Sequence, residues 1–333
     1  MHSSYTHCEL CEWRCGVDRL AGTRGVCRVG PAEVAAISCS ETLRSMSVTL
    51  LGCCYRCLHC NAYRISQYPD PLWWYGRRLD AAELVDEISL HLEALKGIPV
   101  DKISFTGGDP AIHLPFIEEV AAVVRERGLS LGIGIATGGF STPEAMERIA
   151  AICSSITVEI KAFDDCVHRA LTGAPVRPVL RNAAYLAGCA PEKIRVYRTV
   201  AIPGITDRQI PAIAAYIAGL DPDIPYRLIG FRPNFILYYH PGPTMEDMER
   251  LAKECRAQGL NDVAWSGYYP ESMPQGIEQK AAMLSPQYAG CEEAARAAAY
   301  VQSAGCPTHP RDCGACPLRH RCPATLREPW NRR

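Results

Sequence analysis

Three features are missing from this 333-residue sequence, and each absence excludes a class of protein. No apolar run approaches the roughly 18 residues that a membrane-spanning helix needs, so we expect no membrane partner. The formal net charge is −1, which gives no electrostatic footprint for a nucleic-acid partner. The N-terminal residues lack the basic and apolar regions of a secretory signal peptide, so we expect a cytoplasmic protein.

The composition is ordinary except for its cysteines. Apolar residues make up 48% and charged residues 21% of the chain, which excludes a disordered or fibrous protein. The 18 cysteines are many for a cytosolic enzyme. In a reducing compartment, metal binding explains such cysteines better than disulfides do, so the sequence predicts metal–thiolate sites.

The cysteines are grouped rather than evenly spread. Three sets of four are Cys8, Cys11, Cys15 and Cys27; Cys53, Cys54, Cys57 and Cys60; and Cys306, Cys313, Cys316 and Cys322. The others lie singly, as Cys39, Cys153, Cys166, Cys189, Cys255 and Cys291. Isolated cysteines are usually small buried apolar residues, and we assign the single ones that role.

Short apolar runs alternate with helical patterns from Met46 to Trp265. Runs that are too continuous for a half-exposed strand, and therefore typical of buried parallel strands, are 47–51, 102–105, 130–136, 156–160, 194–200 and 226–231. Apolar residues at three- and four-residue spacing mark expected helices at 81–95, 114–127, 143–153, 179–187 and 207–218. Alternating strands and helices predict βαβ units and a parallel sheet.

The length of this alternating stretch limits the kind of sheet. It covers about 220 residues, fewer than the roughly 250 of a complete eight-unit barrel. We therefore expect an α/β fold with a partial (β/α)6 TIM-like barrel, and a doubly wound sheet is the alternative. The barrel domain is predicted at residues 46–272, between cysteine-rich extensions at 1–45 and 273–333.

The loop after the first expected strand carries the most informative motif. Cys53, Cys57 and Cys60 have the spacing C-x3-C-x2-C, and three such thiolates can bind a [4Fe–4S] cluster that keeps one iron open to a chelator. Cys54, Cys57 and Cys60 have the ferredoxin-like spacing C-x2-C-x2-C, which would make Cys53 the spare cysteine. A structural zinc site would need a fourth ligand. His59 is the candidate for it, and it lies in the same tight loop.

The C-x3-C-x2-C motif after a first strand resembles the signature of radical S-adenosylmethionine (SAM) enzymes. Residues 106–110, Thr-Gly-Gly-Asp-Pro, resemble the Gly-Gly-Glu-Pro motif of that superfamily. Residues 159–173 and 198–207 resemble segments of pyruvate formate-lyase activating enzymes, and residues 8–27 and 61–67 resemble an uncharacterised activating-enzyme-like branch. The resemblance covers roughly residues 8–235.

This resemblance implies a radical SAM oxidoreductase with Cys53, Cys57 and Cys60 as its catalytic cysteines. The cluster would chelate SAM, whose reductive cleavage gives a 5′-deoxyadenosyl radical for hydrogen abstraction. The branch implies a protein or peptide substrate, as for glycyl-radical-enzyme activases, an anaerobic setting, and a low-potential donor such as flavodoxin or ferredoxin. A radical SAM enzyme for a small metabolite and a non-catalytic iron–sulfur electron-transfer protein are the alternatives.

The resemblance also implies a set of cofactor-binding residues. They are His59, Gly107, Gly108, Asp109, Pro110, Thr137, Glu159, Lys161, Arg198 and Thr199. Residues 107–109 would hold the SAM ammonium group, and Lys161 or Arg198 would hold its carboxylate or ribose. His59 would stack on the adenine.

Four positions depart from the pattern of the family. Asp109 replaces the usual Glu, and Glu159 stands where activating enzymes commonly have Asp. Ala136 replaces an acidic residue that helps bind a monovalent cation in the family, and Thr199 stands where glycyl-radical activases often have His. The cation site and the substrate therefore stay open.

The two outer cysteine sets also predict metal sites. The C-terminal set, C-x6-C-x2-C-x5-C, resembles auxiliary-cluster domains of peptide-modifying radical enzymes, which implies a second [4Fe–4S] cluster. His309 and His320 keep a zinc site possible there. The N-terminal set, C-x2-C-x3-C-x11-C, predicts a site for either zinc or iron.

The predicted site residues share a position relative to the strands. In barrels of this type the active site lies at the carboxyl ends of the strands. The cysteine loop follows the first expected strand, and 107–110, 137–139, 161, 198–199 and 232 end the others. We therefore expect these residues to meet at one mouth of the barrel.

Overall fold

The computed structural model describes residues 3–66, 76–95, 97–237, 240–269, 279 and 282–288. Cys291, His309, His320 and the C-terminal cysteine set lie outside these residues, as does most of the predicted extension at 273–333. In the described part of the chain, no helix is both long and apolar enough to cross a membrane.

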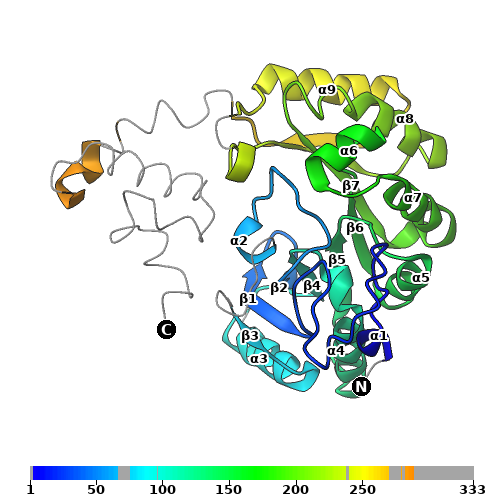
Figure 1. Ribbon diagram of the computed structural model, residues 1–333, viewed down its shortest axis with the longest axis vertical. Coiled ribbons are helices and arrows are strands. Elements are labelled where there is room, and N and C mark those ends of the chain that lie inside the picture. The colour runs from blue at the N-terminus through cyan, green and yellow to red at the C-terminus, as the bar shows by residue number, and fades with distance from the viewer. Residues whose placement is uncertain are drawn as a thin grey trace.

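One sheet runs through the molecule (Figure 1). Its strands are β1 Glu33–Ser40, β2 Ser45–Leu50, β3 Arg77–Arg78, β4 Lys102–Gly107, β5 Gly132–Thr137, β6 Ser155–Glu159, β7 Ile194–Ala201, β8 Tyr226–Gly230 and β9 Val263–Ser266. Their order is β3-β1-β2-β4-β5-β6-β7-β8-β9. From β2 to β9 every neighbouring pair is parallel, whereas β1 and β3 add an antiparallel edge.

The six expected strands correspond to β2 and β4 to β8, so the predicted parallel sheet is confirmed. Two further strands join it. β9 pairs in parallel with β8 and extends the barrel wall. β1 lies in the predicted extension at 1–45 and pairs along β2, from Ser40 beside Ser45 to Val34 beside Leu50. The N-terminal segment therefore shares the sheet of the barrel.

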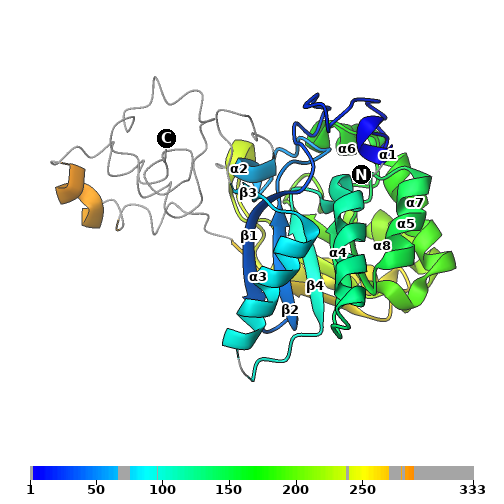
Figure 2. The same ribbon diagram turned by 90° about the horizontal axis from the view of Figure 1, so that it is seen from below.

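The helices cover one face of this sheet. They are α3 Ala81–Ala94, α4 Leu114–Glu126, α5 Pro143–Ile152, α6 Asp165–Thr172, α7 Arg177–Cys189, α8 Ile210–Leu220 and α9 Met245–Ala257. Two further helices, α1 Ser3–Thr6 and α2 Tyr63–Ser66, are short. Among the long helices, α3 packs on α4, α4 on α5, α5 on α7, α7 on α8 and α8 on α9 (Figures 1 and 2). A doubly wound sheet would have helices on both faces, so this single outer layer confirms the partial barrel.

Local sequence determines where two of these helices begin. Asp80 caps α3, because its side chain accepts from the Glu83 amide and the Glu83 side chain accepts from the Asp80 amide. Thr142 caps α5 through the Ala145 amide, and Pro143 occupies the first helical position. Both arrangements satisfy amide groups that a helix leaves unpaired at its start.

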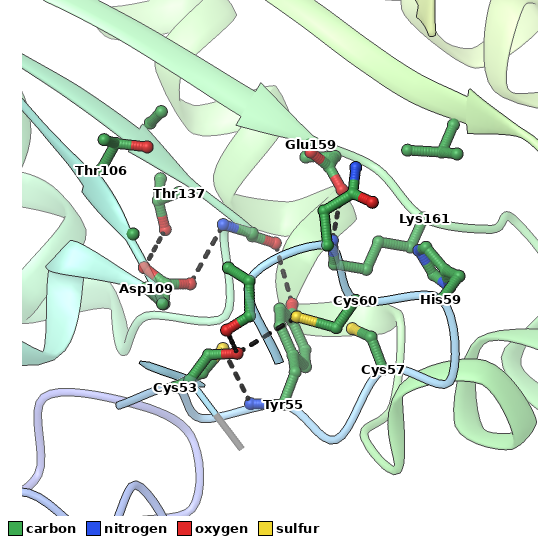
Figure 3. Close-up of a pocket in the computed structure, with 18 of the residues that line it drawn as sticks. Cys53, Tyr55, Cys57, His59, Cys60, Thr106, Asp109, Thr137, Glu159 and Lys161 are labelled. Atoms are coloured by element: carbon green, nitrogen blue, oxygen red, sulfur yellow. Dashed lines mark hydrogen bonds and ion pairs between the residues drawn. The ribbon is translucent and has the colours of Figure 1, made fainter. Parts of the chain in front are cut away.

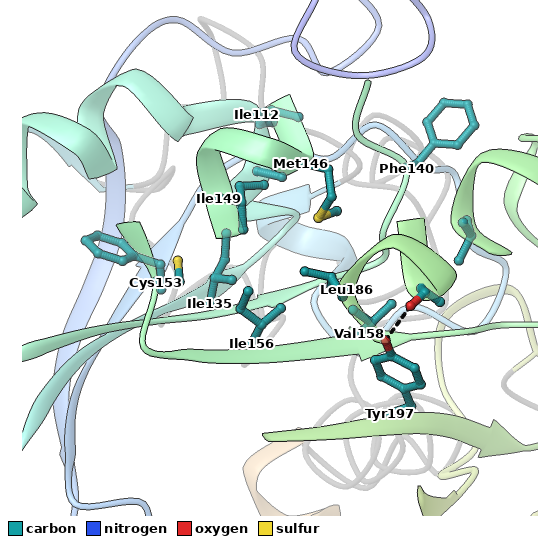
Figure 4. Close-up of a cluster of buried hydrophobic side chains, with 14 of the residues drawn as sticks. Ile112, Ile135, Phe140, Met146, Ile149, Cys153, Ile156, Val158, Leu186 and Tyr197 are labelled. Carbon is teal, nitrogen blue, oxygen red and sulfur yellow. Dashed lines mark hydrogen bonds between the residues drawn. The ribbon is translucent and has the colours of Figure 1, made fainter. Parts of the chain in front are cut away.

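The apolar core lies between the sheet and its helices (Figure 4). Ile135, Ile156 and Val158 project from the strands toward Met146 and Ile149 of α5, and these side chains are buried. Fully burying an aliphatic side chain stabilises a fold by about 1.5–3 kcal/mol. The outer face of the sheet therefore holds the helices, and the inner face is left for function.

The isolated cysteines follow the expected pattern only in part. Cys153 and Cys255 are buried and Cys39 is partly buried, as small apolar residues are. The prediction is wrong for Cys166 and Cys189, which are exposed. Cys166 lies in the first turn of α6 and Cys189 is the last residue of α7, and these helix ends do not face the sheet.

Candidate functional site

The carboxyl ends of the parallel strands surround a cavity of about 330 Å³ (Figure 3). The predicted site residues that line it are Cys53, Cys57, His59, Cys60, Gly107, Gly108, Asp109, Thr137, Glu159, Lys161 and Arg198. They come from the loop after β2 and from the ends of β4 to β7. The chain thus brings these residues to one mouth.

The four cysteines of the loop after β2 point in different directions. Cys53, Cys57 and Cys60 line the cavity, whereas Cys54 is not among the lining residues. The Cys54 Sγ lies 3.7 Å from Oδ2 of Asp109. Its contact with the Cys11 thiol, followed by that with Cys53, raises the pKa of Cys54 well above its usual value. Cys54 therefore faces the N-terminal segment rather than the cavity.

Burial governs the acidity of two of the cavity thiols. Desolvation raises the pKa of Cys57 well above its usual value, although the Lys161 ammonium acts in the opposite direction. Desolvation also raises the pKa of Cys60, and a contact of 3.1 Å with the Ser66 hydroxyl partly offsets this. Metal ligation requires thiolates, so a bound cationic group would compensate for this burial.

Asp109 joins three loops at the wall of the cavity. Its Oδ1 accepts from the Thr137 hydroxyl at 2.8 Å and from the Ala111 amide at 3.1 Å. Its Oδ2 accepts from the Gly138 amide at 3.0 Å. Burial raises the pKa of Asp109, and the Thr137 hydroxyl opposes this shift. Both carboxylate oxygens are therefore already bound by groups of the protein.

Glycine is required at positions 107 and 108 by close backbone approach. A Cβ on Gly108 would lie 1.6 Å from the carbonyl oxygen of Gly52, at the start of the cysteine loop. Gly107 has a φ of +118°, and a Cβ there would lie 2.3 Å from the Leu50 carbonyl oxygen. The end of β4 therefore packs directly against the backbone that carries the cysteines.

Glu159, Lys161 and Arg198 form an ion triad on the opposite wall. Oε1 of Glu159 accepts from the Lys161 ammonium, and Oε2 accepts from Nε of Arg198 at 2.9 Å. Burial acts to raise the pKa of Glu159, but the two cations hold it below its usual value. Burial acts to lower the pKa of Lys161, but Glu159 and Cys57 raise it. Glu159 and Lys161 are therefore both charged at neutral pH.

His59 is buried beside this triad, and burial, followed by the Lys161 charge, lowers its pKa to about 3. The imidazole is therefore neutral at physiological pH. Its Nδ1 is buried and has no hydrogen-bond partner among the described residues. Buried polar atoms normally have a partner, and this nitrogen is one of the few described side-chain atoms without one.

Tyr55, which the sequence motifs do not single out, also lines the cavity. Its hydroxyl donates to the Gly138 carbonyl at 2.8 Å, and its ring lies 5.7 Å from the Lys161 ammonium. A Cβ on Gly138 would lie 2.2 Å from this ring. An aromatic residue inside a cysteine motif gives no separate signal, and only the fold shows that it supports the end of β5.

Two predicted residues do not reach the cavity. Pro110 is buried in the first turn of a 3-10 helix, η1 Pro110–His113. The Thr199 hydroxyl is buried on the other face of β7, where it donates to the Ile160 carbonyl at 2.8 Å and accepts from the Tyr226 hydroxyl at 2.7 Å. Neither lines the cavity, and both stabilise its surroundings.

A second loop approaches the cysteine loop across the mouth. After β8 the chain forms the short 3-10 helix η3 Phe235–Leu237. The ring of Phe235 stacks on that of Tyr63 in α2, with centroids 4.6 Å apart. Nδ2 of Asn234 donates to Oδ1 of Asn61 at 2.7 Å. These contacts join the two sides of the open barrel beside the cavity.

Two of the N-terminal cysteines, Cys8 and Cys27, lie near a buried cation. The guanidinium of Arg19 is buried, donates to the Val29 and Gly30 carbonyls at 3.2 and 2.8 Å, and lies 3.9 Å from the Cys8 Sγ. Cys27 is buried, and the Arg19 charge opposes the rise in its pKa that burial causes. The sulfur atoms of Cys8 and Cys27 therefore lie near the positive charge of Arg19.

Among the described residues, no group of three or more His, Cys, Asp or Glu is arranged to hold a single metal ion. A [4Fe–4S] cluster binds each of its thiolates at a different iron and so holds them farther apart than one ion does. Cys15 packs against Gly25, where an added Cβ would lie 2.9 Å from its Sγ. Metal binding by the N-terminal set stays a prediction.

Comparison with known proteins decides the family. The model of the radical SAM superfamily matches residues 47–217, about half of the chain. The chain belongs to the radical SAM superfamily. Radical SAM proteins use a [4Fe–4S] cluster and SAM, so this chain is an enzyme of the radical SAM class.

The curated relatives indicate a branch of this superfamily. The radical SAM chain is 26% identical over 194 residues to the pyruvate formate-lyase-activating enzyme of Staphylococcus aureus strain USA300, which covers 54% of this chain and 73% of the relative. The enzyme of strain N315 gives the same values. The resemblance to the activating-enzyme-like branch is therefore confirmed.

One solved structure supports the fold. A radical SAM methyltransferase from Sphaerobacter thermophilus is 19% identical, with a TM-score of 0.53 over 69% of this chain and 68% of that one. A domain of a pyruvate-formate lyase-activating enzyme from Bacteroides vulgatus is also 19% identical, with a TM-score of 0.41 over 50% of this chain and 99% of that one. The first of these similarities supports the partial barrel of a radical SAM protein.

Proposed function

We propose that Cys53, Cys57 and Cys60 hold the [4Fe–4S] cluster. One observation carries this proposal: these three thiols open on the strand-end cavity, and Cys54 does not. Three ligands from one loop suit a cluster with one open iron, so the geometry favours the C-x3-C-x2-C spacing. When bound, the cluster supplies the one-electron chemistry that cleaves SAM to methionine and a 5′-deoxyadenosyl radical.

The other residues of the cavity bind and orient SAM. Lys161 and Arg198 present two cations that share one carboxylate, Glu159, so they can also bind the carboxylate or ribose of SAM. His59 offers a neutral ring at the cavity wall for the adenine. The backbone of residues 107–109 forms the wall near the SAM ammonium group, while the Asp109 side chain positions that wall.

The substrate in this proposal is a protein or peptide. The curated relatives are named for activating another enzyme, and such relatives support hydrogen abstraction from a polypeptide, as in glycyl-radical activation. The one-electron donor is a low-potential protein such as flavodoxin or ferredoxin. It delivers its electron near the loop that carries the cysteines.

Product analysis tests the proposed reaction. Anaerobically reconstituted protein, mixed with dithionite and SAM, is expected to form 5′-deoxyadenosine and methionine. A protein that holds its iron and sulfide but forms no 5′-deoxyadenosine would be an electron-transfer protein, and the proposal would be wrong.

Paired serine variants test the ligand assignment. We expect Cys53→Ser to lower 5′-deoxyadenosine formation by more than about 100-fold, since changes beyond the ligands themselves already lower metal affinity or activity roughly 10–100-fold. Cys54→Ser is the matched control and keeps most of the activity, because this thiol faces Asp109. The reverse result would assign the cluster to Cys54, Cys57 and Cys60.

The outer cysteine sets are proposed to hold metal as well. The N-terminal set takes zinc or iron, and the C-terminal set, which lies outside the described residues, takes a second [4Fe–4S] cluster or zinc. For the C-terminal set, metal analysis of the full chain with and without the Cys313→Ser substitution distinguishes the cluster from zinc. A loss of about four irons per chain indicates a cluster there, and a loss of zinc indicates a zinc site.

A further inference from the structure

The inner face of the sheet is polar, in contrast to its outer face. Ser47 of β2, Ser104 of β4, Gly134 of β5 and Ser155 of β6 are direct neighbours across four strands. None of these side chains takes part in the apolar core. Gly134 stands in the middle of this row, where an added Cβ would lie 2.9 Å from the Ser104 hydroxyl oxygen, so a residue without a side chain is needed beside Ser104.

This row borders a second cavity, of about 110 Å³. Thr106, Ala136 and Arg198 line both this cavity and the larger one at the strand ends. The two spaces therefore share a wall and follow one another along the barrel axis. The smaller one has room for a single small group rather than for a nucleoside.

The charges of the second cavity are all positive. Lys102, Arg195 and Arg198 line it, and no Asp or Glu does. Lys102 has an ion-pair partner in Asp101 at 2.6 Å, and Arg198 shares Glu159 with Lys161. Arg195 is exposed and takes part in none of the salt bridges of the described residues.

We propose that this second cavity is an anion-binding subsite, which takes a carboxylate or phosphate group of the substrate. Arg195 offers a guanidinium fork, the geometry that suits both groups. Ser104 and Ser155 add hydroxyl groups beside it. The identification of the bound anion as part of the substrate rests on the proposed function. The binding of an anion at this site does not depend on that function.

The subsite orients what it binds. A substrate whose anionic group lies among Lys102, Arg195 and Arg198 extends past Thr106 and Ala136 into the larger cavity, because these residues border both spaces. The group that reacts then lies at the strand ends, beside the cysteine loop. In a polypeptide substrate the anion is an Asp or Glu side chain, a terminal carboxylate or a phosphorylated residue.

Calorimetric titration of the cluster-loaded protein, without reductant, tests the subsite with three probes: inorganic phosphate, succinate and the neutral analogue succinamide. We expect phosphate or succinate to bind once per chain and succinamide not to bind. Tighter binding of phosphate indicates a phosphate-bearing substrate, and tighter binding of succinate indicates a carboxylate.

The Arg195→Gln variant is expected to weaken anion binding by roughly tenfold or more, as loss of a charge-assisted hydrogen bond does. Arg195→Glu, which reverses the charge, is expected to abolish it. Arg177→Gln removes a charge from an exposed residue of α7 and serves as the matched control, with binding unchanged.

Absence of anion binding to the wild-type protein, or equal binding by Arg195→Glu, would overturn the subsite. The proposed radical chemistry fails separately. If the protein binds succinate or phosphate but forms no 5′-deoxyadenosine with SAM and dithionite, the subsite is supported and the proposed function is wrong. If the protein cleaves SAM but binds neither anion, the proposed function is supported and the subsite is wrong.

Discussion

At position 109 the side chain has a different task from the one that its motif implies. The resemblance assigns this carboxylate to the SAM ammonium, yet its two oxygens accept from Thr137, Ala111 and Gly138. Asp109 thereby fixes the ends of β4 and β5 relative to each other. Sequence alone locates such a residue, but only the hydrogen bonds show that it acts through its neighbours.

An amide at this position tests that role. Asp109→Asn replaces one acceptor by a donor next to the Gly138 amide or the Thr137 hydroxyl. An unsatisfied buried group is destabilising by about 1–3 kcal/mol, so we expect a lower thermal midpoint in SAM-free protein. Asp86→Asn, on an exposed α3 residue, is the control and is expected to change stability by less than about 1 kcal/mol. If the thermal midpoint of Asp109→Asn equals that of wild type, the side chain does not stabilise the strand ends, and binding SAM is its only remaining role.

Glycine 108 gives a steric prediction. In Gly108→Ala the new methyl group would overlap the Gly52 carbonyl oxygen, which is part of a rigid backbone segment. We expect the cysteine loop to move and the reconstituted iron content to fall well below that of wild type. Gly188→Ala, where a Cβ meets nothing within 4 Å, is expected to keep its iron. Full iron loading of Gly108→Ala would show that this close approach is unnecessary.

Among the elements, the N-terminal segment depends most on a single side chain. Arg19 bonds to carbonyls at Val29 and Gly30 and also to that of Ile112, which lies after β4. Its guanidinium also lies 4.8 Å from the ring of Tyr5. A buried arginine with these partners joins the segment to the barrel close to the cysteine loop.

Replacing this arginine tests the attachment. Arg19→Met leaves three buried carbonyls without their donor, and an unsatisfied buried group is destabilising by about 1–3 kcal/mol. We expect a lower midpoint of chemical unfolding and faster proteolysis within residues 3–32. Arg44→Ala, in an exposed ion pair with Asp101, is the control. Equal stability of Arg19→Met and wild type would contradict the attachment.

Sequence patterns predicted some elements better than others for physical reasons. The strands β2 and β4 to β8 are buried, so their apolar runs identify them. β1 reads Glu-Val-Ala-Ala-Ile-Ser-Cys-Ser, with few β-branched residues and a partly exposed face, and β9 has only four residues. Helix α9 is rich in charge, yet Thr244 and Asp247 form a capping box at its start, a signal that the sequence did contain.

For the whole molecule, the predictable part of the site was its location. Strand ends of a parallel barrel meet at one mouth, so Cys53, Thr137 and Lys161 could be placed together from their order alone. The directions of side chains could not be predicted in this way. Whether Cys53 or Cys54 faces the cavity, and whether Thr199 does, depends on the twist and pairing of the strands.

Three buried histidines make the stability of the whole fold depend on pH. Burial lowers the pKa of His59 and His113 to about 3 and that of His168 to about 4. In the unfolded chain they titrate near 6.5, so unfolding takes up protons between pH 6.5 and 4. Stability therefore falls as the pH is lowered through this window, by up to about 1.4 kcal/mol per pH unit for each histidine.

Urea unfolding of the metal-free protein at several pH values between 4 and 6.5 measures this dependence. His113→Gln removes one of the three groups, and we expect a shallower slope. His91→Gln changes an exposed residue of α3 and should leave the slope as in wild type. A slope unaffected by His113→Gln would mean that this histidine is protonated in the folded protein.

In the proposed enzyme, the cavity thiols leave one iron of the cluster open to SAM. Electron paramagnetic resonance of the reduced, cluster-loaded protein tests it directly, before and after SAM is added. We expect a cluster signal that shifts on addition of SAM, both in wild type and in Cys54→Ser. A reduced cluster whose signal is identical with and without SAM would contradict it.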